Sequence, residues 1–298
     1  MYKVSIGIPA YNEEANIKHL LESLLKQKQD NFELQEIIVF SDASTDKTVE
    51  LANSFGDWRI RVIDNKERQG QTGGQNQIIK LFTGDILILL NADILPADED
   101  FLHHLVEPFY ENPAVGLVSC AGAHPRPKTF VEKVLNFSRD IVEDITKSSQ
   151  GTENVYFCHG YARAFSKKFA KTIEWPKSVG EDAYSYFLAK SNEEQFFYQP
   201  KAVVLYRMPQ TLKDHFKQSV RFAFSQKRMQ IQFPHIDIRA EYAISKPALA
   251  LVLIKHFFRH PILTISYLFF QILALFNPYK VTDTNIWEPS QSSKNLVD

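Results

Sequence analysis

Cysteine is scarce in this 298-residue sequence, and neither sign of charge dominates it. The only cysteines, Cys120 and Cys158, both lie in apolar stretches, which favours two buried free thiols in a reducing compartment over a disulfide. The formal net charge of −1 argues against a dedicated nucleic-acid binder, because such proteins usually carry a strong basic excess. We therefore expect no nucleic-acid partner.

The two ends of the sequence lack the usual marks of secretion and of a clean membrane span. The opening residues, MYKVSIGIPAYNEE, have neither the charged region nor the apolar region of a signal peptide, so the main domain is expected in the cytosol. The apolar run Ile262–Phe276 would extend only about 22 Å as a helix, against roughly 30 Å of hydrocarbon. Together with Pro247–Ile254, and with Lys255, His256 and Arg259 between the two runs, it favours an interfacial or re-entrant helix pair. The alternative is packing on the main domain or a homodimer interface.

What the first half does contain is a regular alternation of short apolar runs with amphipathic stretches. The runs predict strands at Val4–Ile8, Glu36–Phe40, Arg59–Ile63, Ile86–Leu90 and Val115–Ser119. The stretches between them predict helices at Glu14–Lys28, Thr45–Phe55 and Gly74–Phe82. Such alternation predicts a parallel sheet covered on both faces, with ligands at the carboxyl ends of the strands.

Beyond Ser119 the pattern is looser. It predicts helices at Phe130–Thr146, Asp182–Lys190 and Leu212–Gln232, and strands at Asn154–His159 and Gln195–Gln199. The composition becomes strongly apolar near Ser245 and polar from Asp283, where a frayed end is expected. We therefore expect a catalytic domain over 1–240, an apolar helical segment that associates with a membrane over 241–282, and a polar tail over 283–298.

The loops after the first two strands carry polar residues with two interpretations. After the first strand, Asn12 suits a helix cap, whereas Tyr11 is an aromatic residue placed where a nucleobase could pack. After the second strand, Asp42 could accept a hydrogen bond from the ring N–H of a base. Ser44 and Thr45 there equally suit the cap of the next helix.

Later acids and one basic segment also have both a structural and a chemical interpretation. Asn91-Ala92-Asp93 follows a buried strand, where it could form a turn or hold a divalent cation on two phosphate oxygens. Glu181-Asp182 precedes a helix, where the two acids could cap the helix or one of them could act as a general base. Gln218–Phe222 lies on the basic helix, either as a solvated face or with Arg221 against a diphosphate.

Taken together and in order, these segments resemble the inverting glycosyltransferases of family 2 over about residues 3–230. The opening Pro9-Ala10-Tyr11-Asn12-Glu13 is similar to that family's Pro-x-Tyr-Asn-Glu, and Asp42–Thr48 to its Asp-Gly-Ser-x-Asp-x-Thr, with Ala43 in place of Gly. Arg68–Asn76 is similar to its Gly-rich stretch, and Asn91-Ala92-Asp93 occupies the place of its metal-binding Asp-x-Asp. Glu181-Asp182 and Gln218–Phe222 match its Glu-Asp pair and its Gln-x-x-Arg-Trp.

The resemblance implies an α/β fold of the GT-A type, Rossmann-like, with a mainly parallel sheet flanked by helices and here an apolar helical tail. By position it assigns contacts with a nucleotide-sugar donor to Pro9, Tyr11, Glu13, Asp42, Asn76, Asn91, Ala92 and Asp93. It assigns Mn²⁺ or Mg²⁺ to Asp93, the catalytic base to Asp182 beside Glu181, and the diphosphate or acceptor to Gln218, Arg221 and Phe222. Three positions depart from the pattern: Asn91 replaces an acid, Gln71 stands where many relatives have Lys, and Phe222 replaces Trp.

The resulting hypothesis is an inverting, metal-dependent glycosyltransferase at the cytoplasmic face of a membrane, with a homo-oligomer left open. The apolar tail favours a lipid-linked acceptor over a growing polysaccharide. A sugar nucleotidyltransferase would carry a Gly- and Arg-rich loop after the first strand, and Pro9–Glu14 has neither residue. A non-catalytic nucleotide-sugar binder or scaffold is the other alternative, suggested by the three departures and opposed by Asp93 and Asp182.

Overall fold

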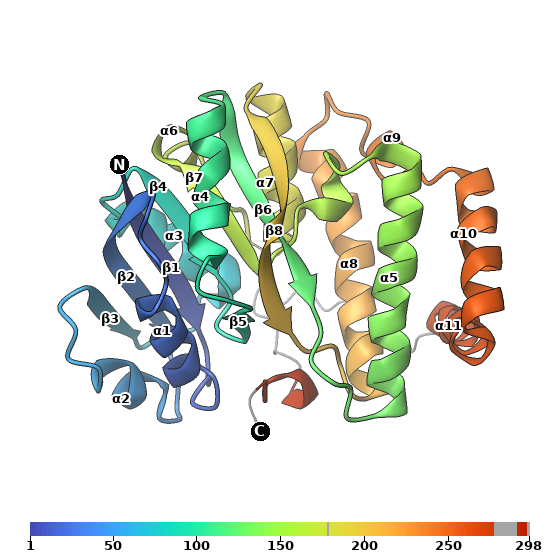
Figure 1. The fold of residues 1–298 in the computed structure, drawn as a ribbon, viewed down its shortest axis with the longest axis horizontal. Helices are drawn as coiled ribbons and strands as arrows, with labels where there is room; N and C mark the ends of the chain where they lie inside the picture. Colours follow the sequence, from blue (N-terminus) through green and yellow to red (C-terminus); the bar gives the residue numbers. More distant parts are fainter. Residues whose placement is uncertain (178, 277–290, 297–298) are drawn as a thin grey trace.

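A computed structural model of the chain describes residues 1–177, 179–276 and 291–296, and gives only the backbone for 221–225 and 291. The described residues form one eight-stranded sheet in the order β3-β2-β1-β4-β7-β6-β8-β5 (Figure 1). Its strands are β1 Tyr2–Ala10, β2 Phe32–Asp42, β3 Ile60–Asn65, β4 Ile86–Leu90, β5 Ile94–Pro96, β6 Val115–Ala123, β7 Ala162–Ser166 and β8 Gln195–Tyr206.

Helices flank the sheet and extend beyond its β8 end (Figure 1). Before β8 they are α1 Ile17–Leu25, α2 Thr48–Asn53, α3 Gly70–Leu81, α4 Phe101–Glu111, α5 Phe130–Gln150, α6 Lys167–Ala170 and α7 Glu181–Ser191. After β8 they are α8 Leu212–Gln232, α9 Ile238–Glu241, α10 Lys246–Arg259 and α11 Pro261–Leu275. Short 3₁₀ helices occupy Val155–Phe157 and Gln291–Ser293.

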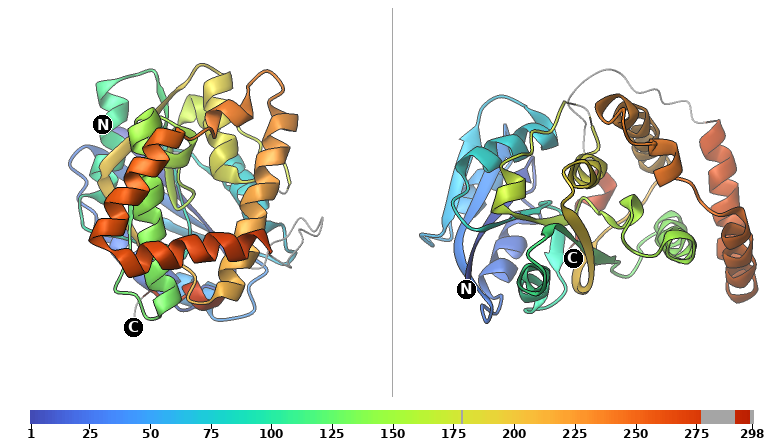
Figure 2. Two further views of the ribbon diagram at one scale, coloured as in Figure 1. Left: turned by 90° about the vertical axis from the view of Figure 1, so that its right-hand side faces the viewer. Right: turned by 90° about the horizontal axis from the view of Figure 1, so that it is seen from above.

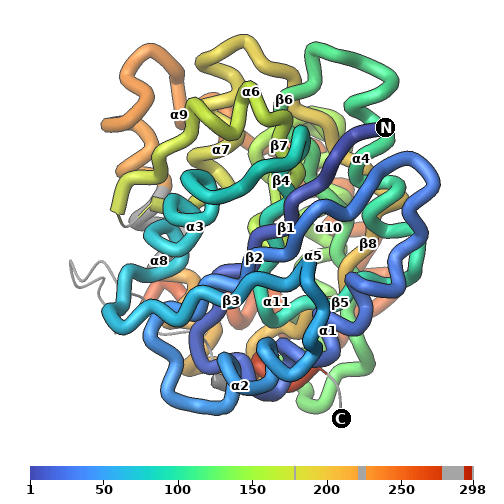
Figure 3. The backbone as a smooth tube through the Cα atoms, turned by 90° about the vertical axis from the view of Figure 1, so that its left-hand side faces the viewer, coloured from blue at the N-terminus to red at the C-terminus, as the bar shows by residue number. Residues whose placement is uncertain are grey.

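The first four strands form the parallel half of the sheet that the sequence predicts. Strand β1 pairs in parallel with β2 and β4, and β2 pairs in parallel with β3. Figure 3 views this half from the β3 edge, with α1 and α2 on one side and α3 on the other. Strand β4 is buried along its whole length because two cores cover its faces, one containing Ile86 and Ile88 and the other Leu87 and Leu89. The carboxyl ends of β1, β2 and β4 therefore share one edge.

The other half of the sheet is mixed, so the prediction of a mainly parallel sheet holds for most strand pairs but not for those that β5 and β7 form. Strand β7 runs antiparallel to both β4 and β6, and β5 runs antiparallel to β8, while β6 and β8 are parallel. The strand predicted at Asn154–His159 is wrong, because only a 3₁₀ turn forms at Val155–Phe157. The real strand is Ala162–Ser166, whose Ala-Arg-Ala-Phe-Ser has little β-branched content and places Arg163 in the interior.

Helices α10 and α11 lie against α5 at the end of the molecule opposite β3 (Figure 2). Val252 of α10 and Phe270 of α11 are buried against α5 residues such as Phe137 and Val134. One side of α10 and α11 therefore packs on the main domain, which the sequence had left open as an alternative. The outward sides remain apolar and exposed. No helix among the described residues is long and apolar enough to cross a membrane.

Two further sequence predictions have clear outcomes. Both cysteines are free and buried, as expected. The expected fraying of the polar end is wrong for residues 291–296, which return to the sheet and hydrogen-bond with the loop after β1. The predicted division at residues 240 and 282 remains a prediction.

Candidate active site

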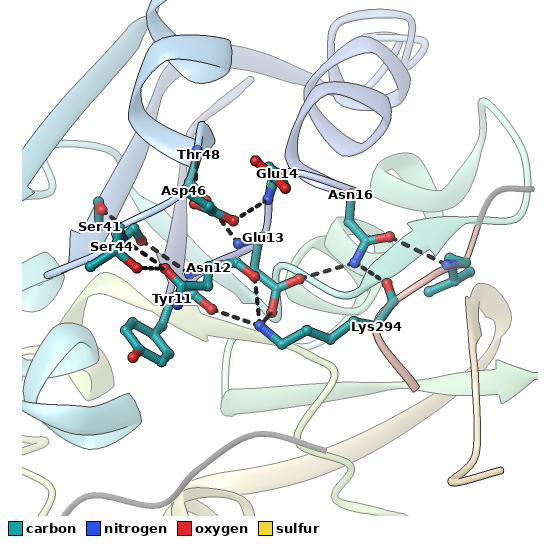
Figure 4. Close-up of polar contacts among 12 residues, drawn as sticks. Tyr11, Asn12, Glu13, Glu14, Asn16, Ser41, Ser44, Asp46, Thr48 and Lys294 are labelled. Atoms are coloured by element: carbon teal, nitrogen blue, oxygen red, sulfur yellow. Dashed lines mark hydrogen bonds and ion pairs between the residues drawn. The ribbon is translucent and has the colours of Figure 1, made fainter. Parts of the chain in front are cut away.

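The loops that follow β1 and β2 are joined to each other, and the first is also joined to the start of α2. The side-chain oxygen of Asn12 accepts from the backbone N–H of Thr45 at 2.8 Å, and the backbone N–H of Asn12 donates to Ser44 Oγ at 3.1 Å. Glu13 N–H donates to Thr48 Oγ1 at 2.8 Å. Asn12 is therefore not the expected helix cap, and α2 begins at Thr48, after the cap expected at Ser44 or Thr45. These crossed hydrogen bonds fix the two loops as one unit (Figure 4).

Asp42 lies at the end of β2 and caps helix α3. Its carboxylate accepts backbone N–H groups of Gln69 at 2.7 Å and Gly70 at 2.8 Å, and it lies 3.2 Å from Arg68 Nε. A negative group is favoured at a helix N-terminus, which explains why α3 begins four residues earlier than predicted. Gly74 lets α3 approach closely, since a Cβ there would lie 3.1 Å from Pro9 Cβ.

Arg68 connects Asp42 with Tyr11. Its guanidinium carbon lies 3.3 Å from the centre of the Tyr11 ring, so the cation stacks on the aromatic face. Tyr11, Asp42 and Arg68 thus form one cluster of an aromatic face, an acceptor and a planar cation. Sequence reasoning identified the first two and missed Arg68, although it stands in the Gly-rich segment.

Glu13 and Asp93 form a second cluster, at the ends of β1 and β4. Burial and the charge of Asp93 raise the pKa of Glu13 to about 7, against the lowering effects of Lys294 and Asn16. Asp93 keeps part of its surface exposed, yet loss of water around its carboxylate also raises its pKa, with Lys294 acting in the opposite direction. Two carboxylates thus share a region where one added positive charge would be stabilising.

Asn91 and Ala92, the other two members of the expected cation segment, have separate roles. The Asn91 side-chain oxygen accepts from Gln71 Nε2 at 2.8 Å, and the Asn91 backbone N–H donates to the Tyr161 carbonyl at 2.9 Å. Ala92 is buried in the core. Asn91 and Gln71 both depart from the family pattern. They form a neutral amide pair that joins the end of β4 to α3.

Glu181 and Asp182 form the first turn of α7, close to the start of β7. The Asp182 carboxylate accepts the backbone N–H of Ala183 at 2.7 Å and remains partly exposed. A Cβ on Gly160 would lie 2.9 Å from Glu181 Oε1 and 3.6 Å from Asp182 Oδ2, so a larger residue there would displace the end of the Glu181 side chain. Because Gly160 precedes Tyr161, whose carbonyl binds Asn91, the acids lie near the end of β4.

A buried arginine, Arg163 of β7, holds the first turn of α7. Its Nη1 donates to the Glu181 carbonyl at 2.6 Å and to Ser185 Oγ at 2.9 Å, and its Nη2 lies 3.9 Å from Glu181 Oε1. A fully buried guanidinium in a strand interior is costly unless it is paired. No sequence pattern pointed to this residue, because the strand that carries it was not predicted.

Asn76 does not face the loops after β1 and β2. Its amide forms two hydrogen bonds with the backbone of Trp175, both at 2.9 Å. The Trp175 indole N–H donates to the Glu181 carbonyl at 3.1 Å. Asn76 therefore supports the acids through Trp175.

The last predicted segment lies on α8, which has the predicted bounds Leu212–Gln232. Gln218 is a described residue of this helix. The side chains of Arg221 and Phe222 lie outside the described part of the chain, so their assigned roles stay predictions.

A residue of the C-terminal segment also reaches the site. Lys294 Nζ donates to the carbonyls of Tyr11 at 2.9 Å and Asn12 at 2.6 Å, and lies 3.1 Å from Glu13 Oε1 (Figure 4). Nothing in the sequence pattern linked residue 294 to residues 11–13.

Within the described residues, no group of three or more His, Cys, Asp or Glu side chains is arranged to hold a metal ion.

Comparisons with known proteins identify the family and the fold of the chain. The family model described as Glycosyl transferase family 2 matches residues 5–174. A poly-beta-1,6-N-acetyl-D-glucosamine synthase of Staphylococcus epidermidis is 23% identical over 224 residues, which make up 74% of this chain and 53% of the relative. The chain therefore spans about half the length of the curated relatives it matches.

Solved structures show the same fold at low sequence identity. The mannosyltransferase PcManGT from Pyrobaculum calidifontis, in complex with GDP-Man and Mn²⁺, has a TM-score of 0.53 and 21% identity, covering 93% of this chain and 82% of its own. Glucosyl-3-phosphoglycerate synthase from Mycobacterium tuberculosis, in complex with Mn²⁺, UDP-Glc and phosphoglyceric acid, has a TM-score of 0.57 and 19% identity, covering 76% of this chain and 79% of its own. These similarities show a GT-A-like α/β fold with a mixed sheet.

Proposed function

The chain belongs to glycosyl transferase family 2, and we propose that it transfers a sugar, with inversion, from a nucleoside-diphosphate sugar to an acceptor at a membrane surface. One observation carries the proposal. The Tyr11–Asp42–Arg68 cluster, the Glu13–Asp93 pair and the Glu181–Asp182 turn lie along one edge of the sheet. This is the edge where α/β sheets bind their ligands.

The nucleoside is assigned to the first cluster. Tyr11 and Arg68 offer planar faces on which a base can stack, and the Asp42 carboxylate has lone pairs left after accepting the N–H groups of α3. The N–H groups of Gln69 and Gly70 are already satisfied by Asp42, so the diphosphate is assigned further along the edge, towards Asp93. Pro9 and Gly74 set how closely α3 can approach there.

The residues at Asp93 fit a hard divalent cation, Mn²⁺ or Mg²⁺, that arrives with the donor. Such ions are often held by one or two carboxylates together with substrate phosphates, which agrees with a site that lacks three protein acids of its own. Asp93 would hold the ion, and the charge of the ion would offset the carboxylates of Asp93 and Glu13. Its chemical contribution when bound is to stabilise negative charge on the departing nucleoside diphosphate.

Asp182 is assigned the general base. It is partly exposed, and its helix turn is fixed by Arg163 and Trp175, so the carboxylate can be aimed at an acceptor. It removes the proton of an acceptor hydroxyl while that oxygen attacks the anomeric carbon. The bond to the diphosphate breaks on the opposite face, which inverts the anomeric centre.

The acceptor is assigned to a membrane surface, as a lipid-linked saccharide or growing glycan. The outward faces of α10 and α11 expose large apolar side chains: Leu251, Phe258, Ile262, Leu275 and Phe276 are each at least 70% exposed. Lys246 and Arg259 of α10, and His260 between α10 and α11, are exposed as well. Apolar burial contributes about 1.5–3 kcal/mol per large side chain, and basic residues add roughly 1 kcal/mol each on an anionic surface.

A screen of nucleotide release tests the donor side of this proposal. Full-length protein is supplied with a panel of nucleotide sugars, with and without Mn²⁺ and a membrane extract. We expect release of one nucleotide that depends on Mn²⁺ and increases with the extract. Release from none of the donors under any condition would refute the transferase and favour the non-catalytic binder.

Liposome flotation at low and high salt tests the membrane side. We expect the full chain to float with anionic vesicles, and the double variant Leu251→Ser with Phe258→Ser to float less. Ile231→Ser is the matched control, because Ile231 is 75% exposed but lies on α8. A full chain that stays in the soluble fraction at both salt concentrations and sediments as a dimer would instead place a second copy on this face.

A further inference from the structure

The ammonium of Lys294 is fully engaged by three consecutive residues of the loop after β1. It binds the carbonyls of Tyr11 and Asn12 and the carboxylate of Glu13, at 2.9, 2.6 and 3.1 Å. An ammonium has three N–H donors, so each donor has an acceptor. Lys294 is only 8% exposed, which is unusual for lysine and requires such pairing. This lysine therefore helps to hold the conformation of the loop to which the nucleotide is assigned.

The backbone around Lys294 is held by a buried asparagine. The side-chain amide of Asn16 donates to the Lys294 carbonyl and to Glu13 Oε2, and its oxygen accepts the Leu296 N–H at 3.4 Å (Figure 4). Asn16 is 1% exposed and Leu296 is 7% exposed. Without residues 294–296 the buried Asn16 amide would lose two of its partners, at a cost typical of unsatisfied polar groups. The segment is thus an integral part of the site.

The same segment also binds the opposite half of the molecule. The Asn295 carbonyl accepts from Arg207 Nε at 3.0 Å, just after β8. Ser292 Oγ accepts the Gln210 N–H at 3.1 Å and donates to Asp214 Oδ2 at 2.6 Å, at the start of α8. The segment 291–296 therefore connects the loop after β1 with the junction between β8 and α8.

The charge of Lys294 also acts on the acids of the cation region. Its ammonium lies 3.1 Å from Glu13 Oε1 and offsets the charge of that carboxylate. A diphosphate that approaches two uncompensated carboxylates would be repelled. An ammonium beside Glu13 reduces that repulsion.

We propose that Lys294 is a positioning residue of the donor site: it holds residues 11–13 in the shape that binds the nucleoside diphosphate and offsets the charge of Glu13. This inference rests on the proposed function, because it takes these loops to be the donor site. The segment 291–296 is then a part of the site supplied from the far end of the chain.

The test is calorimetric binding of UDP and GDP with Mn²⁺ to full-length protein and to Lys294→Met, Lys294→Gln and Lys294→Arg. We expect the Met and Gln variants to bind at least about tenfold more weakly, which corresponds to about 1.4 kcal/mol for a lost charged hydrogen-bond set. The Arg variant, which keeps the charge, should recover part of the loss. Lys168→Met is the matched control. Lys168 Nζ pairs with Glu194 Oε1 at a distance of 2.7 Å, and this pair is not part of these loops.

A second readout separates positioning from a general loss of structure. With an active donor, Lys294→Gln should raise the donor KM while kcat at saturating donor stays close to that of the unaltered protein, because Asp182 is untouched. Should Lys294→Met fail to fold, Lys294→Gln carries the same comparison.

The outcomes distinguish the two proposals. If the unaltered protein binds neither UDP nor GDP, the assigned donor site is wrong, and the role of Lys294 with it. If it binds and the neutral variants bind equally well, only the role of Lys294 is wrong. Tighter binding by the neutral variants would mean that Lys294 competes with the donor, which also overturns the proposal.

Discussion

Glu13→Gln should remove a pH-dependent cost from the metal-free protein. The pKa of Glu13 is raised from 4.5 to about 7, mainly by burial and then by Asp93. A carboxyl whose pKa is higher in the folded state binds its proton more tightly there, so it lowers stability as pH rises. The cost is absent below pH 4.5, grows between pH 4.5 and 7, and is complete above pH 7. At about 1.4 kcal/mol per pKa unit, it reaches roughly 3 kcal/mol.

The assay is urea unfolding in EDTA from pH 4.5 to 8, comparing unaltered protein with Glu13→Gln. Relative to the unaltered protein, the variant should gain about 3 kcal/mol of unfolding free energy across this range. Glu33→Gln, a change of an exposed glutamate on β2, should show no such trend. The stability difference between Glu13→Gln and the unaltered protein could instead stay constant with pH. That result would refute the claim that burial and Asp93 raise the pKa of Glu13.

Three further predictions follow from the site. Asp93→Ala should abolish Mn²⁺-dependent binding of UDP or GDP in calorimetry, and unchanged affinity would refute the cation assignment. Asp182→Asn should keep nucleotide binding but lower turnover at least about 100-fold, the usual scale for loss of a general base. Turnover near that of the unaltered protein would mean that Asp182 only caps α7. Ala43→Gly should raise unfolding free energy in urea by roughly 0.5–1 kcal/mol, because Ala43 has a φ of 59° that favours glycine; a less stable variant would contradict this.

The parallel half of the fold was readable from sequence because local pattern and final structure agree there. Strand β4 has the predicted bounds Ile86–Leu90, since five apolar residues in a row indicate a strand covered on both faces. Helix α4 carried a readable signal that was passed over, with apolar residues at 101, 102, 105, 106 and 109. Strand β7 carried almost none, because its place is determined by its neighbours β4 and β6 and its sequence contains a buried arginine.

The sequence by itself determined the family and the order of the chemical groups along the chain, because the family's motifs occur in its order. Tyr11, Asp42, Asp93 and Asp182 could be named from that resemblance. Only the tertiary structure decided what each group contacts. Asp42 caps α3, and Asn76 supports the acids through Trp175. Lys294 lies against residues 11–13, more than 280 positions earlier in the chain. Local pattern describes a residue's neighbours along the chain, whereas burial, charge pairing and the return of a distant segment depend on how the whole sheet is assembled.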